Sequence, residues 1–464
     1  MYTNLLNFLK RACPMSDREI TLVGAGLVGS LLAIFLAKRG FKVSVYERRP
    51  DLRKTDISAG KSINLALANR GIFPLEQVGL MDRVRKIILP MRGRMIHDEQ
   101  GKTNFQAYGQ KEHEVIYSIS RSGLNALLLD AAEETGRVNF SFNHLCKQVD
   151  FSKQQLEFID QVKGESNIVS FKQVIGSDGS GSTIRKAILA QKCEQDSNEP
   201  LGHSYKELCM PQKAGGGFAM EADALHIWPR GEYMQIALPN LDGSFTVTLF
   251  MPNEGQLSFA GIDTTAKLKD FYKNNFSDSL AHLPELYNEY FSNPTGSLVT
   301  VRCKPWSFAG KALILGDAAH AIVPFHGQGM NCGFEDCSAF MECIDRSDSW
   351  EEVFRSFESL RKPNCDAIAD LAIANYIEMR NTVRDPKFQL KKRLAFQLEE
   401  LYPDLFIPQY SMVMFHRMPY LRAKQIGQVQ DKILEECVAG VDLPESLDLA
   451  MARRLVEENQ MSLN

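Results

Sequence analysis

Two glycine-rich loops, one near the start of the chain and one in its last third, constrain the fold more than any other feature. The first reads Gly24-Ala25-Gly26-Leu27-Val28-Gly29, and the second runs from Gly316-Asp317 to Gly329-Met330-Asn331. Glycines at the first spacing let a backbone turn tightly and approach a pyrophosphate. Together the loops indicate one long cofactor held at both ends, which favours a flavin dinucleotide over a nicotinamide coenzyme.

The residues around the first loop predict a complete βαβ unit. Ile20–Val23 is a short apolar strand, Ser30–Lys38 a helix ended by Gly40, and Lys42–Glu47 a second strand. The apolar run of residues 20–37 has nearly the length of a membrane span, but its glycine spacing favours strand, turn and buried helix. Glu47 ends the second strand, where an acid accepts hydrogen bonds from an adenosine ribose and disfavours a 2′-phosphate. The loop is therefore predicted to bind FAD or NAD.

Two further motifs follow strands later in the chain. Asp178-Gly179, followed by Arg185, is ambiguous alone, because Asp-Gly is common in turns. Asp317 follows the apolar strand Ala312–Leu315, where it can bind a ribityl hydroxyl. The glycine-rich segment beyond it starts a helix whose positive end can stabilise a reduced flavin.

The rest of the chain divides into a strand-rich middle and a helical end. Alternation from about Glu207 to Phe250 predicts antiparallel strands. We expect Ser118–Glu134 to be a helix, Phe171–Ile175 a strand, and the chain after Leu315 to be mainly helical. The predicted fold class is α/β: a Rossmann-like FAD-binding domain, an interleaved antiparallel-sheet substrate domain and a helical C-terminal region. Their expected ranges are 15–185 with 300–345 (including part of the substrate pocket near 57–110), 186–299, and 346–464.

Composition excludes several classes of function. The net charge of -4 gives no global basic field for nucleic acid. The 10 cysteines form no CxxC pair, so we predict no metal and interpret the cysteines as buried reduced thiols of a cytosolic protein. Residues 1–14 lack a signal-peptide pattern, and no apolar run near the C-terminus predicts a membrane anchor. We therefore expect a soluble cytoplasmic protein; the sequence leaves its oligomeric state open.

The three motifs, in this order, resemble the fingerprints of the FAD-dependent group A aromatic hydroxylases. Within that family the chain is most similar to the members that hydroxylate L-kynurenine. The likeness covers roughly residues 20–420, and the strings that carry it include 61–67, 93–98, 226–230 and 324–336. The resemblance implies the aromatic hydroxylase type of FAD-binding domain.

The resemblance also assigns site residues. The implied FAD contacts are Gly24, Ala25, Gly26, Leu27, Val28, Gly29, Glu47, Arg121, Asp178, Gly316, Asp317, Pro324, Gly327, Gln328, Gly329, Met330 and Asn331. The implied substrate contacts are Arg94, Tyr108, Phe325, His326, Asn375 and Tyr410. Arg94 and Tyr108 would grip a carboxylate; without the resemblance, Arg94 reads as a surface cation beside Arg92, and Asn375 and Tyr410 as ordinary helix and core residues.

The implied reaction uses FAD, NADPH and O2 to convert L-kynurenine to 3-hydroxy-L-kynurenine through a flavin hydroperoxide. It would belong to tryptophan degradation and pyridine nucleotide (NAD) biosynthesis. No catalytic side chain is expected, since the flavin carries the chemistry; His97 and His320 are interpreted as structural. NADPH is expected to bind transiently, because the chain has no second dinucleotide loop.

Two other functions stay open at this point. One is a related flavin hydroxylase or epoxidase acting on a phenol, a quinone or a lipid. The other is a non-enzymatic escort protein that uses the dinucleotide fold without redox chemistry.

Overall fold

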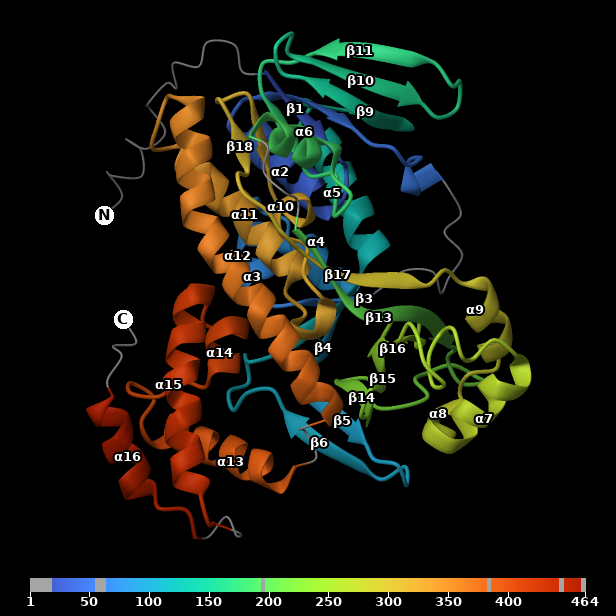
Figure 1. Cartoon of the computed structure of the whole chain (residues 1–464), viewed down its shortest axis with the longest axis vertical. Helices are drawn as coiled ribbons and strands as arrows, with labels where there is room; N and C mark the ends of the chain where they lie inside the picture. Colours follow the sequence, from blue (N-terminus) through green and yellow to red (C-terminus); the bar gives the residue numbers. More distant parts are fainter. Residues whose placement is uncertain (1–18, 55–63, 193–196, 382–384, 442–445, 460–464) are drawn as a thin grey trace.

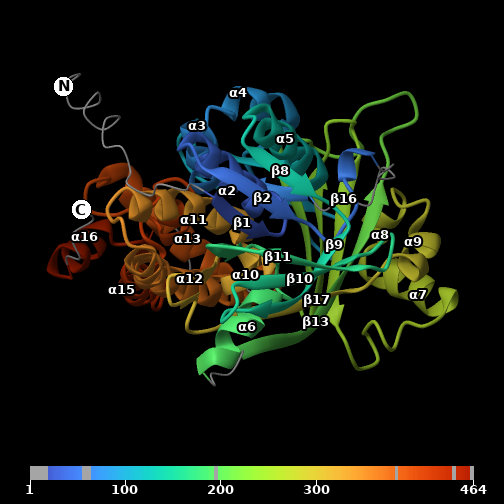
Figure 2. The ribbon, with the colours of Figure 1, turned by 90° about the horizontal axis from the view of Figure 1, so that it is seen from above.

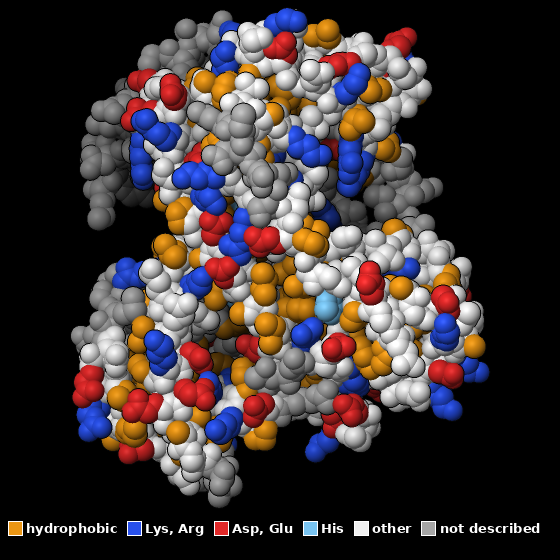
Figure 3. Space-filling model, in the orientation of Figure 1, with side chains coloured by type: hydrophobic (Ala, Val, Ile, Leu, Met, Phe, Trp, Pro, Cys, Tyr) orange, Lys and Arg blue, Asp and Glu red, His pale blue; other side chains and the backbone are white. Residues whose placement is uncertain are grey.

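The computed structural model describes residues 19–54, 64–192, 197–381, 385–441 and 446–459. The N-terminal appendage of residues 1–14 and the start of the 61–67 string lie outside these ranges. Figure 1 shows the parallel sheet and its helices in the upper part of the molecule, with a second sheet and the C-terminal helices below. Basic and acidic side chains are interspersed over the face shown in Figure 3.

A six-stranded sheet forms the centre of the upper part. Its strand order is β18-β19-β12-β1-β2-β8, and every pair is parallel except β18 with β19. The apolar run of β1 is buried on both faces because helices and a further sheet cover the strands (Figure 2). The strands are β1 Glu19–Val23, β2 Lys42–Tyr46, β8 Val138–Ser141, β12 Val174–Gly176, β18 Ser307–Phe308 and β19 Ala312–Ile314.

Helices of the upper part pack on this sheet and on one another. The helix α2 packs against α5, α11 and β2, and nearly all of its residues are buried. These helices are α2 Leu27–Lys38, α5 Arg121–Glu134, α6 Thr183–Lys192, α10 Asp317–His320 and α11 Gly329–Ile344.

Two small sheets flank this layer. One is antiparallel, β9 His144–Asp150, β10 Gln155–Asp160 and β11 Ser166–Ser170. The other joins β3 Asn64–Leu67, β7 Ile116–Ser120 and β4 Ile88–Met91. Between β3 and β4 the chain forms α3 Asn69–Gln77, α4 Met81–Val84 and the short 3-10 turn Arg85–Ile87, and a second such turn, Leu52–Lys54, follows β2.

A seven-stranded sheet forms the lower part, in the order β17-β13-β16-β15-β14-β5-β6. The strands are β5 Gly93–His97, β6 Thr103–Ala107, β13 Ser197–Met210, β14 Ala224–Arg230, β15 Tyr233–Pro239, β16 Phe245–Pro252 and β17 Gly296–Arg302. Three helices lie at one side of this sheet (Figure 1): α7 Thr265–Asn275, α8 Ser277–Leu280 and α9 Leu286–Ser292. The opposite face contributes Ile227, Met234 and Phe250 to a core shared with Phe325 and Tyr376.

The C-terminal region is helical, as predicted. The long α12 packs against α11 and α15, and so connects the upper part with the helices that end the chain. These helices are α12 Trp350–Asn381, α13 Pro386–Leu401, α14 Gln409–Met414, α15 Tyr420–Val438 and α16 Leu449–Glu458.

The α/β class with several sheets is confirmed, and three local predictions need correction. Residues 118–120 end β7, and the helix begins only at Arg121, because Ser120 is its N-cap and accepts a hydrogen bond from Gly123 N. The strand expected at Phe171–Ile175 is β12, shifted to Val174–Gly176. The large sheet is not wholly antiparallel, since β14 pairs in parallel with β5. The domain limits stay predictions.

No helix in the described ranges combines the length and apolar composition that a membrane crossing needs. The cytoplasmic location stays a prediction.

Candidate active site

The first glycine loop presents bare backbone to solvent at the end of β1. Gly24 has φ of 105°, and a Cβ there would fall 2.4 Å from Ser177 O. A Cβ on Gly29 would fall 2.1 Å from Gly24 O, whereas one on Gly26 meets nothing within 4 Å. Gly26 is therefore the open point of the loop, where a phosphate can approach the backbone.

Glu47 closes the same loop from the end of β2. Its carboxylate accepts hydrogen bonds from Ala25 N at 2.8 Å and Arg49 N at 2.9 Å. Each carboxylate oxygen keeps acceptor capacity after one such bond. The predicted contact of Glu47 with an adenosine ribose therefore stays compatible with this geometry.

The second glycine loop lies directly beside the first. β19, β12 and β1 are adjacent parallel strands, so their carboxyl ends meet at one edge of the sheet. A Cβ on Gly316 would fall 3.2 Å from Val28 Cγ1, and one on Gly333 would fall 2.6 Å from Val28 Cγ2. The two loops, far apart in sequence, thus form one continuous rim.

Helix α11 begins at this rim with an unblocked amino end. Its N-cap residue Gln328 makes no side-chain cap hydrogen bond, and its first turn holds no acidic residue. Free backbone N–H groups at a helix start attract negative charge. The rim and this helix end fit the pyrophosphate and the flavin of FAD, respectively.

Several predicted cofactor residues use their side chains to hold the loops. Asn331 donates to Ala66 O at 2.8 Å and Gly327 O at 2.7 Å, and accepts from Ala68 N at 2.9 Å. Asp178 accepts from Thr183 N at 2.7 Å, and burial raises its pKa. Asp178 therefore caps α6 in this structure, and its contact with FAD stays a prediction.

The remaining predicted cofactor residues divide by exposure. Arg121, Asp317 and Pro324 are exposed, so ligand atoms can reach their side chains. Ala25, Leu27 and Met330 are buried, and Gly327 and Gly329 are half-buried. Such residues can offer a ligand mainly their backbone.

Gln328 links the second glycine loop to the C-terminal helices through hydrogen bonds. Its side chain is fully buried, accepts a hydrogen bond from Tyr420 Oη at 2.7 Å and donates to Met414 Sδ at 3.0 Å. The ring of Tyr420 also stacks on buried Arg70, whose Cζ lies 3.8 Å from the ring centroid. Arg70 in turn pairs with Glu335 on α11 at 2.8 Å.

Arg94 is the centre of the predicted substrate pocket. It is only 6% exposed, and its Cζ lies 5.1 Å from the ring centroid of Tyr410 and 5.7 Å from that of Tyr108. Its Nη1 lies 3.2 Å from Glu378 Oε1. Burial opposes the charge, but Tyr410 and Glu378 keep the pKa of Arg94 above its ordinary value. Arg94 is therefore a permanent buried cation and not the surface cation that sequence alone suggested.

Aromatic side chains wall this pocket. Tyr108 and Tyr410 stack with centroids 5.7 Å apart, and His326 stacks on Tyr410 at 5.4 Å. Phe325 stacks on Tyr376 at 3.9 Å. Burial lowers the pKa of His326 to about 4, so this imidazole is neutral near pH 7. The flat, apolar surfaces suit an aromatic ring.

Asn375 fixes one of these walls. Its Nδ2 donates to Phe325 O at 2.6 Å, across from α12 to the loop before α11. The structure thus brings together all six predicted substrate residues in one connected cluster.

The sequence reasoning missed Glu378, the partner of Arg94. Glu378 lies three residues after Asn375, so both lie on one face of α12. Helical periodicity counted from Asn375 could have found it.

His320 belongs to a buried network behind the second loop. Its Nε2 lies 2.6 Å from Asp336 Oδ2, and Arg361 Nε donates to Asp336 Oδ1 at 2.7 Å. Burial opposes protonation of His320, but Asp336 raises its pKa well above the ordinary value. Cys332 and Cys365 adjoin this group, with their sulfurs 3.6 Å apart. We interpret the network as structural, because its cations and carboxylates already satisfy one another.

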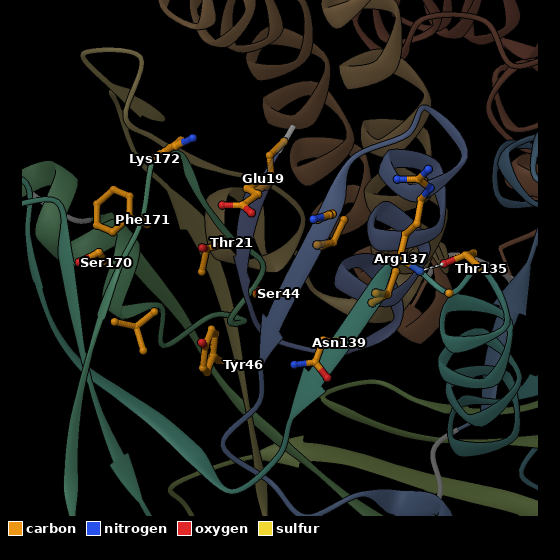
Figure 4. A pocket seen from close by; sticks show the side chains of 16 residues that line it. Glu19, Thr21, Ser44, Tyr46, Thr135, Arg137, Asn139, Ser170, Phe171 and Lys172 are labelled. Atoms are coloured by element: carbon orange, nitrogen blue, oxygen red, sulfur yellow. Dashed lines mark hydrogen bonds between the residues drawn. The ribbon is translucent and has the colours of Figure 1, made fainter. Parts of the chain in front are cut away.

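A large hollow of about 1020 Å³ lies elsewhere (Figure 4). Its lining includes Glu19, Lys42 and Val138, which begin β1, β2 and β8. Ligands of parallel sheets bind outside the carboxyl ends of the strands, and this hollow lies at the opposite, amino ends.

Comparisons with known proteins agree with this geometry. A family model described as FAD binding domain matches residues 17–203 and 293–344. The solved structure of 2-methyl-3-hydroxypyridine-5-carboxylic acid oxygenase covers 80% of this chain and 94% of its own, with a TM-score of 0.64 and 20% identity. Pseudomonas aeruginosa PqsL in complex with 2-aminobenzoylacetate covers 78% and 96%, with a TM-score of 0.62 and 18% identity. The fold is therefore that of the FAD-binding aromatic hydroxylases.

Closer relatives narrow this class. The kynurenine 3-monooxygenase of Myxococcus xanthus (strain DK1622) is 48% identical over 437 residues, which is 94% of each chain. That of Flavobacterium johnsoniae is 47% identical over 419 residues, covering 90% of this chain and 93% of the relative. The chain belongs to the kynurenine 3-monooxygenase family.

Proposed function

We propose that this enzyme converts L-kynurenine to 3-hydroxy-L-kynurenine with FAD, NADPH and O2, as a step of tryptophan degradation that leads toward NAD. The observation that carries the proposal is the buried cation Arg94, which lies beside two stacked tyrosine rings and beside Glu378. A buried guanidinium in an aromatic pocket suits an aromatic substrate that carries a carboxylate.

The two glycine loops are proposed to hold FAD across the rim. Backbone N–H groups at Gly26 and the start of α2 would bind the pyrophosphate, Glu47 the ribose and Asp317 the ribityl chain. The amino end of α11 would face the flavin ring. Bound FAD would supply the redox chemistry that activates O2, with electrons from transiently bound NADPH.

The charged end of the pocket is proposed to recognise an amino acid. Arg94 would bind the substrate carboxylate in a bidentate manner, and Tyr108 and Tyr410 would add hydrogen bonds. Glu378 would then accept the α-ammonium group. The 2-aminobenzoylacetate bound by PqsL has a carboxylate but no α-ammonium, so Glu378 is our candidate for the residue that selects kynurenine over such a keto acid.

The apolar walls are proposed to orient the aminophenyl ring. Phe325, held by Asn375 and stacked on Tyr376, and neutral His326 offer flat surfaces near the flavin loop. They would also keep water from the reacting atoms.

The test is NADPH consumption by purified enzyme, with and without L-kynurenine, and mass-spectrometric identification of the product. Kynurenine should stimulate oxidation strongly and yield a product one oxygen heavier. Weak stimulation by kynurenine beside a strong response to a phenolic acid would favour the related-hydroxylase alternative. A colourless protein that takes up no FAD would favour the escort alternative.

A further inference from the structure

A groove of about 560 Å³, lined by both apolar and polar side chains, lies between the edge strand β6 and helix α13. The strand side is formed mainly by Asn104, Phe105, Gln106 and Gln110, and the helix side includes Gln389, Lys392, Arg393 and Phe396. No function assigned so far uses this groove.

Gln106 connects the groove with Arg94. The two residues are directly opposite each other in the antiparallel pair of β5 and β6. Side chains of directly opposite residues project to the same face of a sheet. Gln106 therefore lines the groove and lies next to the charged end of the substrate pocket.

Lys392 lines the groove on the α13 side and reaches across it to Gln106. Its Nζ is 3.5 Å from Gln106 Oε1 and 5.7 Å from the ring centroid of Phe396. Burial and the charge of Arg94 lower the pKa of Lys392 to about 8, while Glu378 acts in the opposite direction. The ammonium of Lys392 thus lies within the electrostatic reach of both charged residues of the pocket.

Within the part of the chain that the structure describes, Lys392 forms no ion pair. Its neighbour Lys391 forms an ion pair with Asp431 at 3.0 Å, whereas the described residues place no carboxylate within 4.0 Å of the Lys392 ammonium. A half-buried cation that lines a groove attracts anionic ligands. The proposed substrate, kynurenine, carries such an anionic group in its carboxylate.

We infer that the groove between β6 and α13 is the entry route of kynurenine, and that Lys392 binds the substrate carboxylate there before Arg94 receives it. This inference rests on the proposed function. Lys392 would increase the rate of capture at low substrate concentration, and would leave the chemistry at saturation unchanged.

The charge is tested with the FAD-loaded enzyme. Lys392→Gln should lower kcat/KM for kynurenine about tenfold, with kcat nearly unchanged, and the loss should shrink at high salt. Lys392→Arg should keep most of kcat/KM. Lys387→Gln removes the same charge from an exposed position of α13 outside the groove and should have no effect.

The entry route is tested by placing a bulky side chain in the groove. Asn104 is exposed on the groove wall, so Asn104→Trp should slow kynurenine binding in stopped-flow measurements, and Asn104→Ala should not. Wild-type enzyme that fails to respond to kynurenine would refute the proposed function itself. If the wild type responds, unchanged kcat/KM in Lys392→Gln, an equal loss in Lys387→Gln, or unhindered binding in Asn104→Trp would overturn the entry route.

Discussion

The rim proposed to bind FAD and the proposed substrate pocket meet at residues 324–331, yet they use different kinds of group. The rim offers backbone: Gly26 is open to solvent and α11 begins without a side-chain cap. The pocket offers side chains, with Arg94 from β5, Glu378 from α12 and Tyr410 from α14. A backbone site depends on local sequence, because turns set it, whereas a side-chain site depends on how distant elements pack.

The largest expected effect tests the rim, where the backbone is proposed to bind FAD. Gly26→Val should weaken FAD binding by about 3 kcal/mol, the value of two charge-assisted hydrogen bonds, or about 100-fold. The fold should persist, since nothing lies within 4 Å of the added Cβ. Fluorescence titration of apoprotein with FAD measures the affinity, and thermal unfolding of apoprotein the fold.

Gly29→Val is the matched comparison, because its Cβ would collide with Gly24 O. It should destabilise the apoprotein itself. Equal FAD affinity in Gly26→Val and the wild type would show that the pyrophosphate lies elsewhere.

The second largest expected effect tests the side chains of the substrate pocket. Arg94→Ala should weaken kynurenine binding by about 2 kcal/mol, about 30-fold, because the substrate carboxylate loses its paired cation. FAD content should stay near normal, since Arg94 lies outside the rim. The exposed neighbour Arg92, changed to Ala, serves as control. Unaltered binding in Arg94→Ala would remove this residue from the site.

A smaller effect should separate the two charges of the pocket. Glu378→Gln should lower kcat/KM for kynurenine about fivefold, as expected for a partly exposed ion pair of about 1 kcal/mol. The kcat/KM for the analogue of kynurenine that lacks the α-amino group should change little, because that analogue has no ammonium for Glu378. Parallel kinetics with both compounds measure this selectivity, and an equal loss for the two would argue against ammonium recognition.

The smallest expected effect is on the stability of the fold at acidic pH. His326 has its pKa lowered from 6.5 to about 4 in the folded chain, so the unfolded chain binds more protons as the pH falls from 6.5 toward 4. Stability should therefore decrease in that window, by about 1.4 kcal/mol per pH unit from this group. His320, with its raised pKa, acts in the opposite direction above pH 6.5 and adds no further change below it. The difference between variants is therefore the quantity to measure.

Urea unfolding at pH 7.5 and 5.5 gives that difference. In His326→Asn the decrease in the free energy of unfolding between these two pH values should be about 1 kcal/mol smaller than in the wild type. In His113→Asn, at an exposed position, the decrease should equal that of the wild type. Identical pH slopes in His326→Asn and the wild type would mean that the fold does not lower the pKa of His326.

The same contrast explains what the sequence could predict. Gly24 to Gly29 and Glu47 belong to one βαβ unit, so glycine spacing and strand ends are enough to identify the first half of the rim. Arg94 is surrounded in sequence by another arginine and a glycine, and only the family resemblance singles it out. The parallel pairing of β5 with β14 joins segments more than a hundred residues apart, which no local pattern records. Glu378 and Lys392 acquire their significance only through that packing.

The contact of Gln328 with Tyr420 bears on how the enzyme can be dissected. The matched FAD-binding residues end at 344, but Tyr420 and Met414, which hold Gln328, lie well beyond that limit. A fragment cut at 344 would leave Gln328 and the guanidinium of Arg70 in contact with water. The flavin-binding region is therefore no transplantable module, and fusion partners or chimeric joints belong outside the span from Ile20 to Tyr420.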